Sequence, residues 1–163
     1  MATAASDPRE AILQKAMIQD TIDRYAMFLN CREWDSFAKL LRPEFVFTCS
    51  EPIPRHCESR DAMLQMLAGS DNYRHGFVFQ MPHGVVVDRL SDGEARTRHT
   101  LHIKATGMNV LGVYYDALAL EDDGVWRFRR RDYRITYHDG LQVPGEHYRL
   151  FPDHGRPEWY FAG

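Results

Sequence analysis

The 163-residue sequence predicts an α+β domain in which N-terminal helices pack on one face of an antiparallel sheet. Two observations indicate this class. The first third of the chain carries apolar residues at helical spacing. From about residue 77 onward, alternating segments are separated by short turns that contain glycine, which is typical of hairpin-linked strands. The length and a hydrophobic content of 44% fit one domain, residues 1–163, with a sizeable core.

The first helix is predicted to begin at Asp7 and Pro8 and to end near Asn30. Asp7 can serve as N-cap, and Pro8 at the first helical position loses no hydrogen bond because its N–H would have no helical partner. One apolar stripe of this helix, at positions i, i+4, i+7 and i+11, should face the sheet: Ile18, Ile22, Tyr25 and Leu29.

Two further helices should be shorter. The one that begins around Trp34 should end before Pro43, because the residue before a proline avoids the helical region. A short strand is expected at residues 45–48. The next helix should begin after Ser59 as its N-cap and should end at the turn-forming residues 69–72. These helices would cover the sheet together with the first one.

The rest of the chain should form the sheet, after a short bridging strand at residues 77–79. Four strands are predicted, joined by turns around Gly93 and Gly124: 85–87, 94–104, 112–120 and 125–137. In the second of these strands, the odd-numbered residues, including His99, make the more apolar face. From about His138 the tail is irregular, but its aromatic residues are expected to pack on the domain.

Composition and charge exclude several classes of function. A net charge of −3 gives no electrostatic case for nucleic-acid binding. No apolar run reaches the roughly 18 residues of a membrane span, and the first residues lack a signal-peptide pattern. Three cysteines, Cys31, Cys49 and Cys57, have no metal-type spacing. We therefore expect a cytoplasmic protein with free thiols, no membrane partner and no bound metal.

Three motifs occur in an order and at a spacing that together resemble a known family: RYAMFLNCREWDSF at 24–37, MPHG at 81–84, and GVYYD followed by DGVWRF within 112–128. Over roughly residues 8–137 the chain resembles the SnoaL-like group of the NTF2-like superfamily. The resemblance implies a cone of helices and curved sheet that encloses a pocket. Its members include scytalone dehydratase, bile acid 7α-dehydratase, polyketide cyclases and ketosteroid isomerase. The small subunit of ring-hydroxylating dioxygenases shares the fold without contributing catalytic residues.

The resemblance suggests His83, Asp116 and Tyr25 as catalytic residues. His83 matches a histidine of both dehydratases and could transfer a proton near neutral pH from the pocket wall. Tyr25 matches a helix tyrosine of the bile acid enzyme and could donate a hydrogen bond to a substrate oxygen. Asp116 falls near a strand aspartate of the group and could orient the His83 ring as a dyad. The structural alternatives are a backbone-bonded histidine, a core aromatic residue and a salt-bridged carboxylate.

Substrate contacts are expected from Asn30, His99 and Tyr114. Asn30 stands where the family usually has an acidic residue, so it could bond a substrate oxygen or end the helix. His99 shares the apolar face of its strand, and Tyr114 shares a strand face with Asp116. His99 and His102 do not form a metal pair, because residues three apart on a strand point to opposite faces.

The predicted function is that of a cofactor-independent dehydratase or isomerase acting on a small, largely apolar, oxygenated ring compound of polyketide, steroid or terpenoid type. The alternative is a non-catalytic ligand-binding protein or the small subunit of a ring-hydroxylating dioxygenase. An epoxide hydrolase would need more pocket carboxylates than Asp116. A homodimer or higher homo-oligomer is expected, because one face of a strand looks too apolar to leave in water: Val113, Tyr115, Ala117 and Ala119.

Overall fold

The computed structural model describes residues 7–139 and 156–160. Its helices are α1 (Pro8–Cys31), α2 (Trp34–Lys39), α3 (Arg60–Gly69), α4 (Asp71–Arg74) and a 3₁₀ turn, η1 (Glu158–Tyr160). Its strands are β1 (Leu41–Cys49), β2 (Arg55–Cys57), β3 (Val78–Ser91), β4 (Glu94–Ala105), β5 (Met108–Leu120) and β6 (Trp126–Asp139). Within these residues, no helix is both long and apolar enough to cross a membrane.

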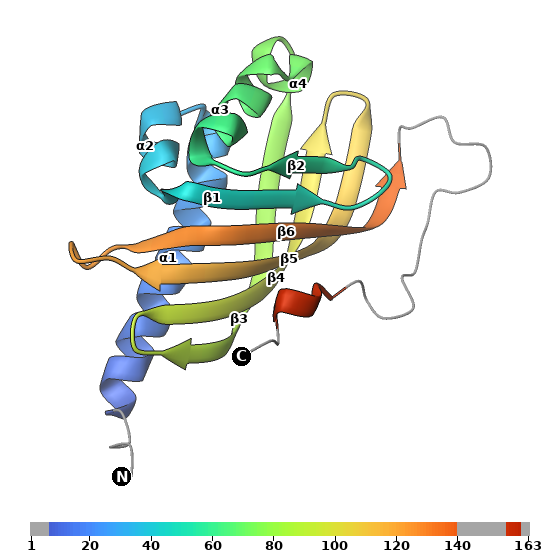
Figure 1. Cartoon of the computed structure of the whole chain (residues 1–163). Coiled ribbons are helices and arrows are strands. Elements are labelled where there is room, and N and C mark those ends of the chain that lie inside the picture. The colour runs from blue at the N-terminus through green and yellow to red at the C-terminus, as the bar shows by residue number, and fades with distance from the viewer. Residues whose placement is uncertain (1–6, 140–155, 161–163) are drawn as a thin grey trace.

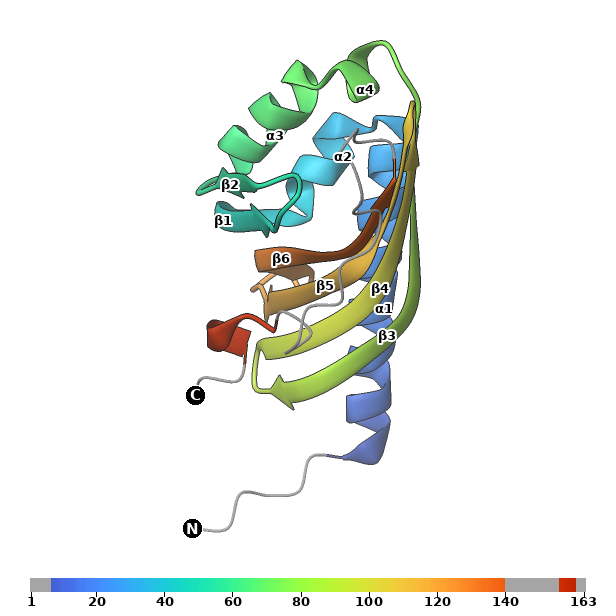
Figure 2. The ribbon, with the colours of Figure 1, turned by 90° about the vertical axis from the view of Figure 1, so that its right-hand side faces the viewer.

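The strands form one six-stranded sheet in the order β2-β1-β6-β5-β4-β3 (Figure 1). The predicted α+β class is confirmed, and the sheet is strongly curved and does not close (Figure 2). The prediction of a purely antiparallel sheet is wrong at one pair, because β1 runs parallel to β6. β1 enters the sheet from the helices rather than from a hairpin, so no tight turn fixes its direction.

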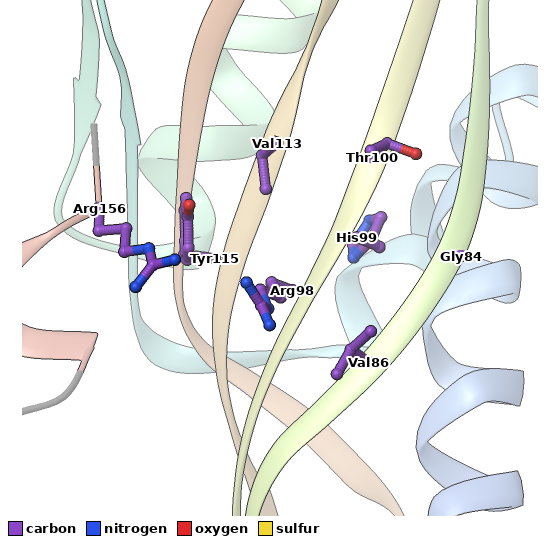
Figure 3. Close-up of a pocket in the computed structure, with 8 residues that line it drawn as sticks. All are labelled: Gly84, Val86, Arg98, His99, Thr100, Val113, Tyr115 and Arg156. Atoms are coloured by element: carbon purple, nitrogen blue, oxygen red, sulfur yellow. The ribbon is translucent and has the colours of Figure 1, made fainter. Parts of the chain in front are cut away.

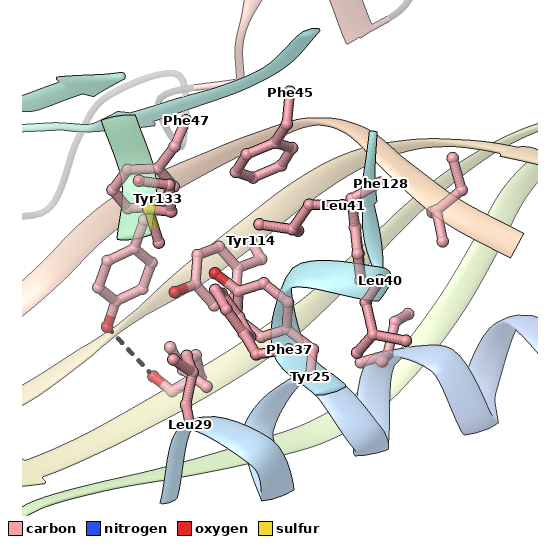
Figure 4. Close-up of a cluster of buried hydrophobic side chains, with 14 of the residues drawn as sticks. Tyr25, Leu29, Phe37, Leu40, Leu41, Phe45, Phe47, Tyr114, Phe128 and Tyr133 are labelled. Atoms are coloured by element: carbon pink, nitrogen blue, oxygen red, sulfur yellow. Dashed lines mark hydrogen bonds between the residues drawn. The ribbon is translucent and has the colours of Figure 1, made fainter. Parts of the chain in front are cut away.

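Helix α1 begins as predicted, with the Asp7 side chain accepting a hydrogen bond from the Arg9 N–H. The predicted apolar stripe faces the sheet, and its four side chains are all at most 1% exposed: Ile18, Ile22, Tyr25 and Leu29. We call the sheet face that packs against this stripe the inner face; it carries Leu101, Tyr114, Leu118 and Phe128. Figure 4 shows how rings from α1, α2 and the strands meet in this core.

Several elements differ from the sequence prediction: β1 begins at Leu41 rather than at 45, and α4 begins within the predicted turn at 69–72. Pro43 lies inside β1 rather than ending a helix, because α2 already ends at Lys39. The predicted separate strands at 77–79 and 85–87 are both part of β3, which starts at Val78 and continues to Ser91. The difference in β3 matters for the site, because this strand contains a register shift between His83 and Val86 that changes which of its side chains face inward.

The opposite, outer face of the sheet is covered in part by η1 (Figures 1 and 2), so the predicted packing of the aromatic tail is confirmed for Trp159 and Tyr160, and its other aromatic residues lie outside the described residues. Trp159 lies between the guanidinium groups of Arg96 and Arg130, at 5.0 and 4.8 Å from its ring centroid. Tyr160 packs edge-on against Tyr115, with ring centroids 5.0 Å apart. The outer-face residues expected to need a second copy are therefore largely covered within one chain. The homo-oligomer remains a prediction, but an exposed apolar outer face no longer supports it.

Candidate functional site

A buried ion pair lies at the centre of the inner face. Asp116 of β5 accepts two hydrogen bonds from Arg131 of β6, from Nε at 2.6 Å and from Nη2 at 2.8 Å, and a third from the Thr97 hydroxyl at 3.3 Å. Asp116 and Arg131 are at most 1% exposed. The pair lies inward because β6 has a bulge opposite Ala117 and Leu118, which places both Phe128 and Arg131 on the inner face.

Aromatic rings replace water around the Arg131 guanidinium. Its central carbon lies 4.0 Å from the Tyr25 ring centroid, 4.1 Å from that of Tyr114 and 4.2 Å from that of Phe128. Asp116 raises the pKa of Arg131 above its usual value, although burial opposes this. Burial raises the pKa of the Asp116 carboxyl, against the opposing effect of Arg131 and Thr97. The two charges cancel within hydrogen-bond distance, so the pair stays ionised as a neutral unit.

His99 of β4 lies beside this pair, with its Nδ1 atom 3.5 Å from Asp116 Oδ2. The Nδ1 atom is buried and makes no hydrogen bond among the described residues. Burial, together with the positive charge of Arg131, lowers the pKa of His99 well below 6.5, so the imidazole is neutral at neutral pH. Its ring centroid lies 5.3 Å from that of Tyr114. His99 is therefore a buried, neutral and only partly satisfied histidine.

The inner cavity, of about 420 Å³, lies between the sheet and α3 and α4. Most of its wall is apolar, with Met63 and Leu67 from α3 and Ile103, Val110 and Ile135 from the strands. The polar lining residues include three tyrosines and a cysteine: Tyr73, Tyr114, Tyr133 and Cys49. Two charged lining residues, Arg55 and Asp71, are exposed.

The polar groups of the wall are hydrogen-bond donors rather than bases. Burial raises the pKa of the Tyr73, Tyr114 and Tyr133 hydroxyls above the ordinary value of 10. Burial also raises the pKa of the Cys49 thiol to about 12. All four groups therefore keep their protons at neutral pH. The Tyr133 hydroxyl donates a hydrogen bond to the Leu101 carbonyl oxygen at 3.5 Å (Figure 4).

The structure does not bring the predicted dyad together. His83 is exposed on the outer face, where it is paired with Thr100, and its carbonyl oxygen accepts a hydrogen bond from the Thr100 hydroxyl. Asp116 lies on the inner face with Arg131. The prediction that His83 lies at the pocket wall beside Asp116 is wrong, because the register of β3 on β4 shifts between His83 and Val86, which leaves Gln80, opposite Ile103, facing inward and His83, opposite Thr100, facing outward.

The other predicted residues have mixed positions. Tyr114 lines the inner cavity, as expected for a substrate contact. Tyr25 is buried in the core, packed against Phe37 and Phe128 at centroid distances of 4.8 and 5.2 Å, and its hydroxyl has no partner among the described residues. Burial raises the pKa of Tyr25 to about 12. Asn30 does not face a ligand, because its side-chain amide bonds the backbone of Gln80.

Sequence reasoning missed Arg131, Gln80 and Tyr73. Arg131 sits in a run of arginines, and only the β6 bulge distinguishes it from its exposed neighbour Arg129. Gln80 and Tyr73 lie in a region that the sequence predicts to form turns and a short bridging strand. The alternation of Val78 and Gln80 was a local signal, but the register shift between His83 and Val86 separates it from the alternation that begins at Val85.

A second cavity, of about 360 Å³, lies on the outer face (Figure 3). Its lining includes Val86 of β3, Arg98 and Thr100 of β4, and Tyr115 of β5. Arg98 lies with its Nε atom 2.9 Å from Asp88 Oδ2, and this carboxylate also accepts a hydrogen bond from the Tyr160 hydroxyl at 2.9 Å. Of the two arginines among the described residues that line this outer cavity, Arg98 and Arg156, Arg98 is thus paired with a carboxylate of the same chain.

The fold and site define an α+β domain whose open, curved sheet and helices surround an apolar inner cavity. The family model of the SnoaL-like domain matches residues 10–132, and the chain belongs to this family. The resemblance found in the sequence is thereby confirmed. No curated protein matches the sequence.

Solved structures with the same fold differ widely in their described activities. A scytalone dehydratase-like protein from Novosphingobium aromaticivorans superposes with a TM-score of 0.71 at 19% identity, covering 91% of this chain and 97% of that one. The hexachlorocyclohexane dehydrochlorinase LinA type 2 superposes with a TM-score of 0.70 at 15% identity, covering 88% of this chain and 98% of that one. A protein assigned as the β-subunit of an aromatic-ring-hydroxylating dioxygenase, from Novosphingobium aromaticivorans, superposes with a TM-score of 0.62 at 13% identity, covering 86% of this chain and 99% of that one. At these identities the likeness establishes the fold.

We predict that Asp116→Asn lowers the free energy of unfolding by about 3–5 kcal/mol, because it leaves the buried Arg131 charge without its partner. The double variant Asp116→Leu with Arg131→Met should cost less than Asp116→Asn alone, since it removes both charges. Urea denaturation measures both. A single variant that costs under about 1 kcal/mol would show that the pair does not hold the inner face together.

We predict that the chain loses stability as the pH falls below about 6.5, the pKa of His99 in the unfolded chain. The pKa of His99 is lower in the folded than in the unfolded chain, so only the unfolded chain takes up this proton in that range. The loss from His99 is at most about 1.4 kcal/mol per pH unit. Burial also lowers the pKa of His138, so His138→Gln is the comparison variant: it removes a second histidine of the same kind and leaves His99 in place. His99→Gln should flatten the dependence; an unchanged slope in that variant contradicts the assignment.

Proposed function

We propose that the inner cavity binds a small, neutral, largely apolar ring compound that carries oxygen. The observation that supports this most directly is the wall itself: apolar side chains from α3 and the strands, with protonated tyrosine hydroxyls among them. A volume of about 420 Å³ falls in the range of small-molecule pockets. The Tyr114 hydroxyl suits a hydrogen bond to a ligand oxygen. Because His83 lies outside this cavity, we rank ligand binding above catalysis by His83 as the function of the cavity.

The polar donors of the wall also suggest how a ligand would be oriented. A ring compound would gain affinity from contact with Ile103, Met108 and Val110, whose side chains line the same wall as Tyr114. A carbonyl or hydroxyl oxygen could then accept from Tyr114, which keeps its proton because burial raises its pKa. A charged ligand fits less well, because the buried charges beneath the wall already cancel.

We predict that 2-naphthol, a bicyclic phenol, binds the wild-type chain in isothermal titration calorimetry. Ile103→Trp, which fills the inner cavity, should weaken binding at least tenfold. Val86→Trp is the matched control, because it places the same side chain in the outer cavity and should leave affinity within about twofold. If instead Val86→Trp abolishes binding and Ile103→Trp does not, the ligand site lies on the outer face and this proposal fails.

A second candidate function is acid–base catalysis of elimination or isomerisation, as in the dehydratase-type and dehydrochlorinase neighbours. One observation favours it: the His99 imidazole, neutral at neutral pH, packs against Tyr114, which lines the inner cavity, and its Nδ1 lies 3.5 Å from the Asp116 carboxylate, which could orient the ring. A neutral imidazole can accept a proton, and an adjacent tyrosine hydroxyl can stabilise the oxygen that gains charge. His99 would then take the role that sequence analysis gave to His83.

We predict that the chain accelerates hydrogen–deuterium exchange next to the carbonyl of 2-tetralone, followed by NMR in D₂O, because proton removal there is the first step of such reactions. His99→Gln should reduce the rate about 100-fold, the usual contribution of general acid–base catalysis. His83→Ala, on the exposed outer face, is the control and should retain the rate. Loss of exchange in His83→Ala with retention in His99→Gln would restore the original assignment and exclude this one.

A further inference from the structure

Gln80 is a buried polar residue in the wall of the inner cavity. It lies on the inner face of β3 and is 6% exposed. Its side-chain Nε2 donates a hydrogen bond to the Tyr73 hydroxyl at 3.2 Å. Its Oε1 atom is buried and accepts no hydrogen bond from any described residue. A buried amide oxygen without a donor is uncommon in folded proteins and calls for an explanation.

The backbone of Gln80 is held rigidly. Asn30, at the end of α1, donates from Nδ2 to the Gln80 carbonyl oxygen at 2.9 Å and accepts from the Gln80 N–H at 2.7 Å. This two-point contact ties β3 to α1 over a separation of 50 residues. The position of the Gln80 side chain in the cavity wall is therefore fixed from outside the cavity, which is the arrangement that a recognition residue requires.

Tyr73 holds the other end of the amide. Its ring packs edge-on against Trp34, with centroids 5.7 Å apart, and lies 5.7 Å from the Arg32 guanidinium. The Gln80 nitrogen thus uses one of its two N–H groups on Tyr73, and this bond holds the amide plane in place. The Oε1 atom is the acceptor of this amide, and it has no donor among the described residues.

We propose that Gln80 selects ligands that carry a hydroxyl group, which donates its proton to Oε1. This inference rests on the proposed function and adds the chemical group that the cavity recognises. A neutral hydroxyl fits better than an ammonium, because Asp71, the carboxylate among the described lining residues, is exposed. The ring of the ligand would lie against Ile103 and Val110, and a second oxygen could accept from Tyr114.

The selection is testable with two probes of one ring system. Wild type should bind 2-naphthol about tenfold more tightly than 2-methoxynaphthalene, which has the same rings and oxygen but no proton to donate. Gln80→Met keeps the length and loses both polar atoms. It should bind the two probes within about twofold of each other, with 2-methoxynaphthalene affinity close to wild type.

Tyr73→Phe is the second variant and keeps Gln80 in place. It should retain the preference for 2-naphthol, since the acceptor remains. If Gln80→Met weakens both probes equally and keeps the preference, Gln80 only supports the wall and the inference is wrong. It is also wrong if Tyr73→Phe erases the preference while Gln80→Met keeps it, because the hydroxyl is then read by Tyr73. Failure of the proposed function has a different signature: neither probe binds wild type, or both bind Ile103→Trp as they bind wild type.

Discussion

The buried ion pair between Asp116 and Arg131 is the constraint on which the inner face depends. Two charges removed from water are tolerated only when each is bonded at several points. Here two bonds join the pair, Thr97 adds a third to the carboxylate, and three aromatic rings enclose the guanidinium. One of those rings belongs to Tyr25, so the pair fixes the register of β4, β5 and β6 and also the depth at which α1 packs. A shift of β5 against β6 would leave both charges unpaired, and a shift of β4 or α1 would remove Thr97 or the Tyr25 ring from the pair.

Much of the fold was predictable because it follows from local periodicity. The α1 stripe, its Asp7 cap and the Ser59 cap of α3 each depend on a few neighbouring residues, and the structure has all of them. The parallel pairing of β1 with β6 and the bulge in β6 were not predictable, because both depend on contacts between distant segments. The bulge in particular decides that Arg131 faces inward. Alternation without a bulge would place Arg130 there instead.

The site was harder to predict for a related reason. Motif similarity drew attention to His83, but the register shift of β3 between His83 and Val86 determines which residues before it face the cavity. With this shift, Gln80 faces inward and His83 outward. Asn30 shows the same limit: its helix position was predicted, but its bonds to the Gln80 backbone cross 50 residues of sequence. A polar residue at a helix end can contact a ligand or a strand, and only the three-dimensional fold decides between them.

The ion pair and the cavity meet at Tyr114, and this explains why a neutral ligand suits the site. One side of its ring packs against the Arg131 guanidinium at 4.1 Å, and the residue lines the inner cavity. Arg131 is neutralised by Asp116, and His99 next to it stays uncharged because burial lowers its pKa. The layer directly beneath the cavity therefore carries buried charges that sum to zero. A ligand there meets hydroxyl and amide dipoles rather than a net charge, so shape and hydrogen-bonding pattern, rather than electrostatic attraction, are left to determine what binds.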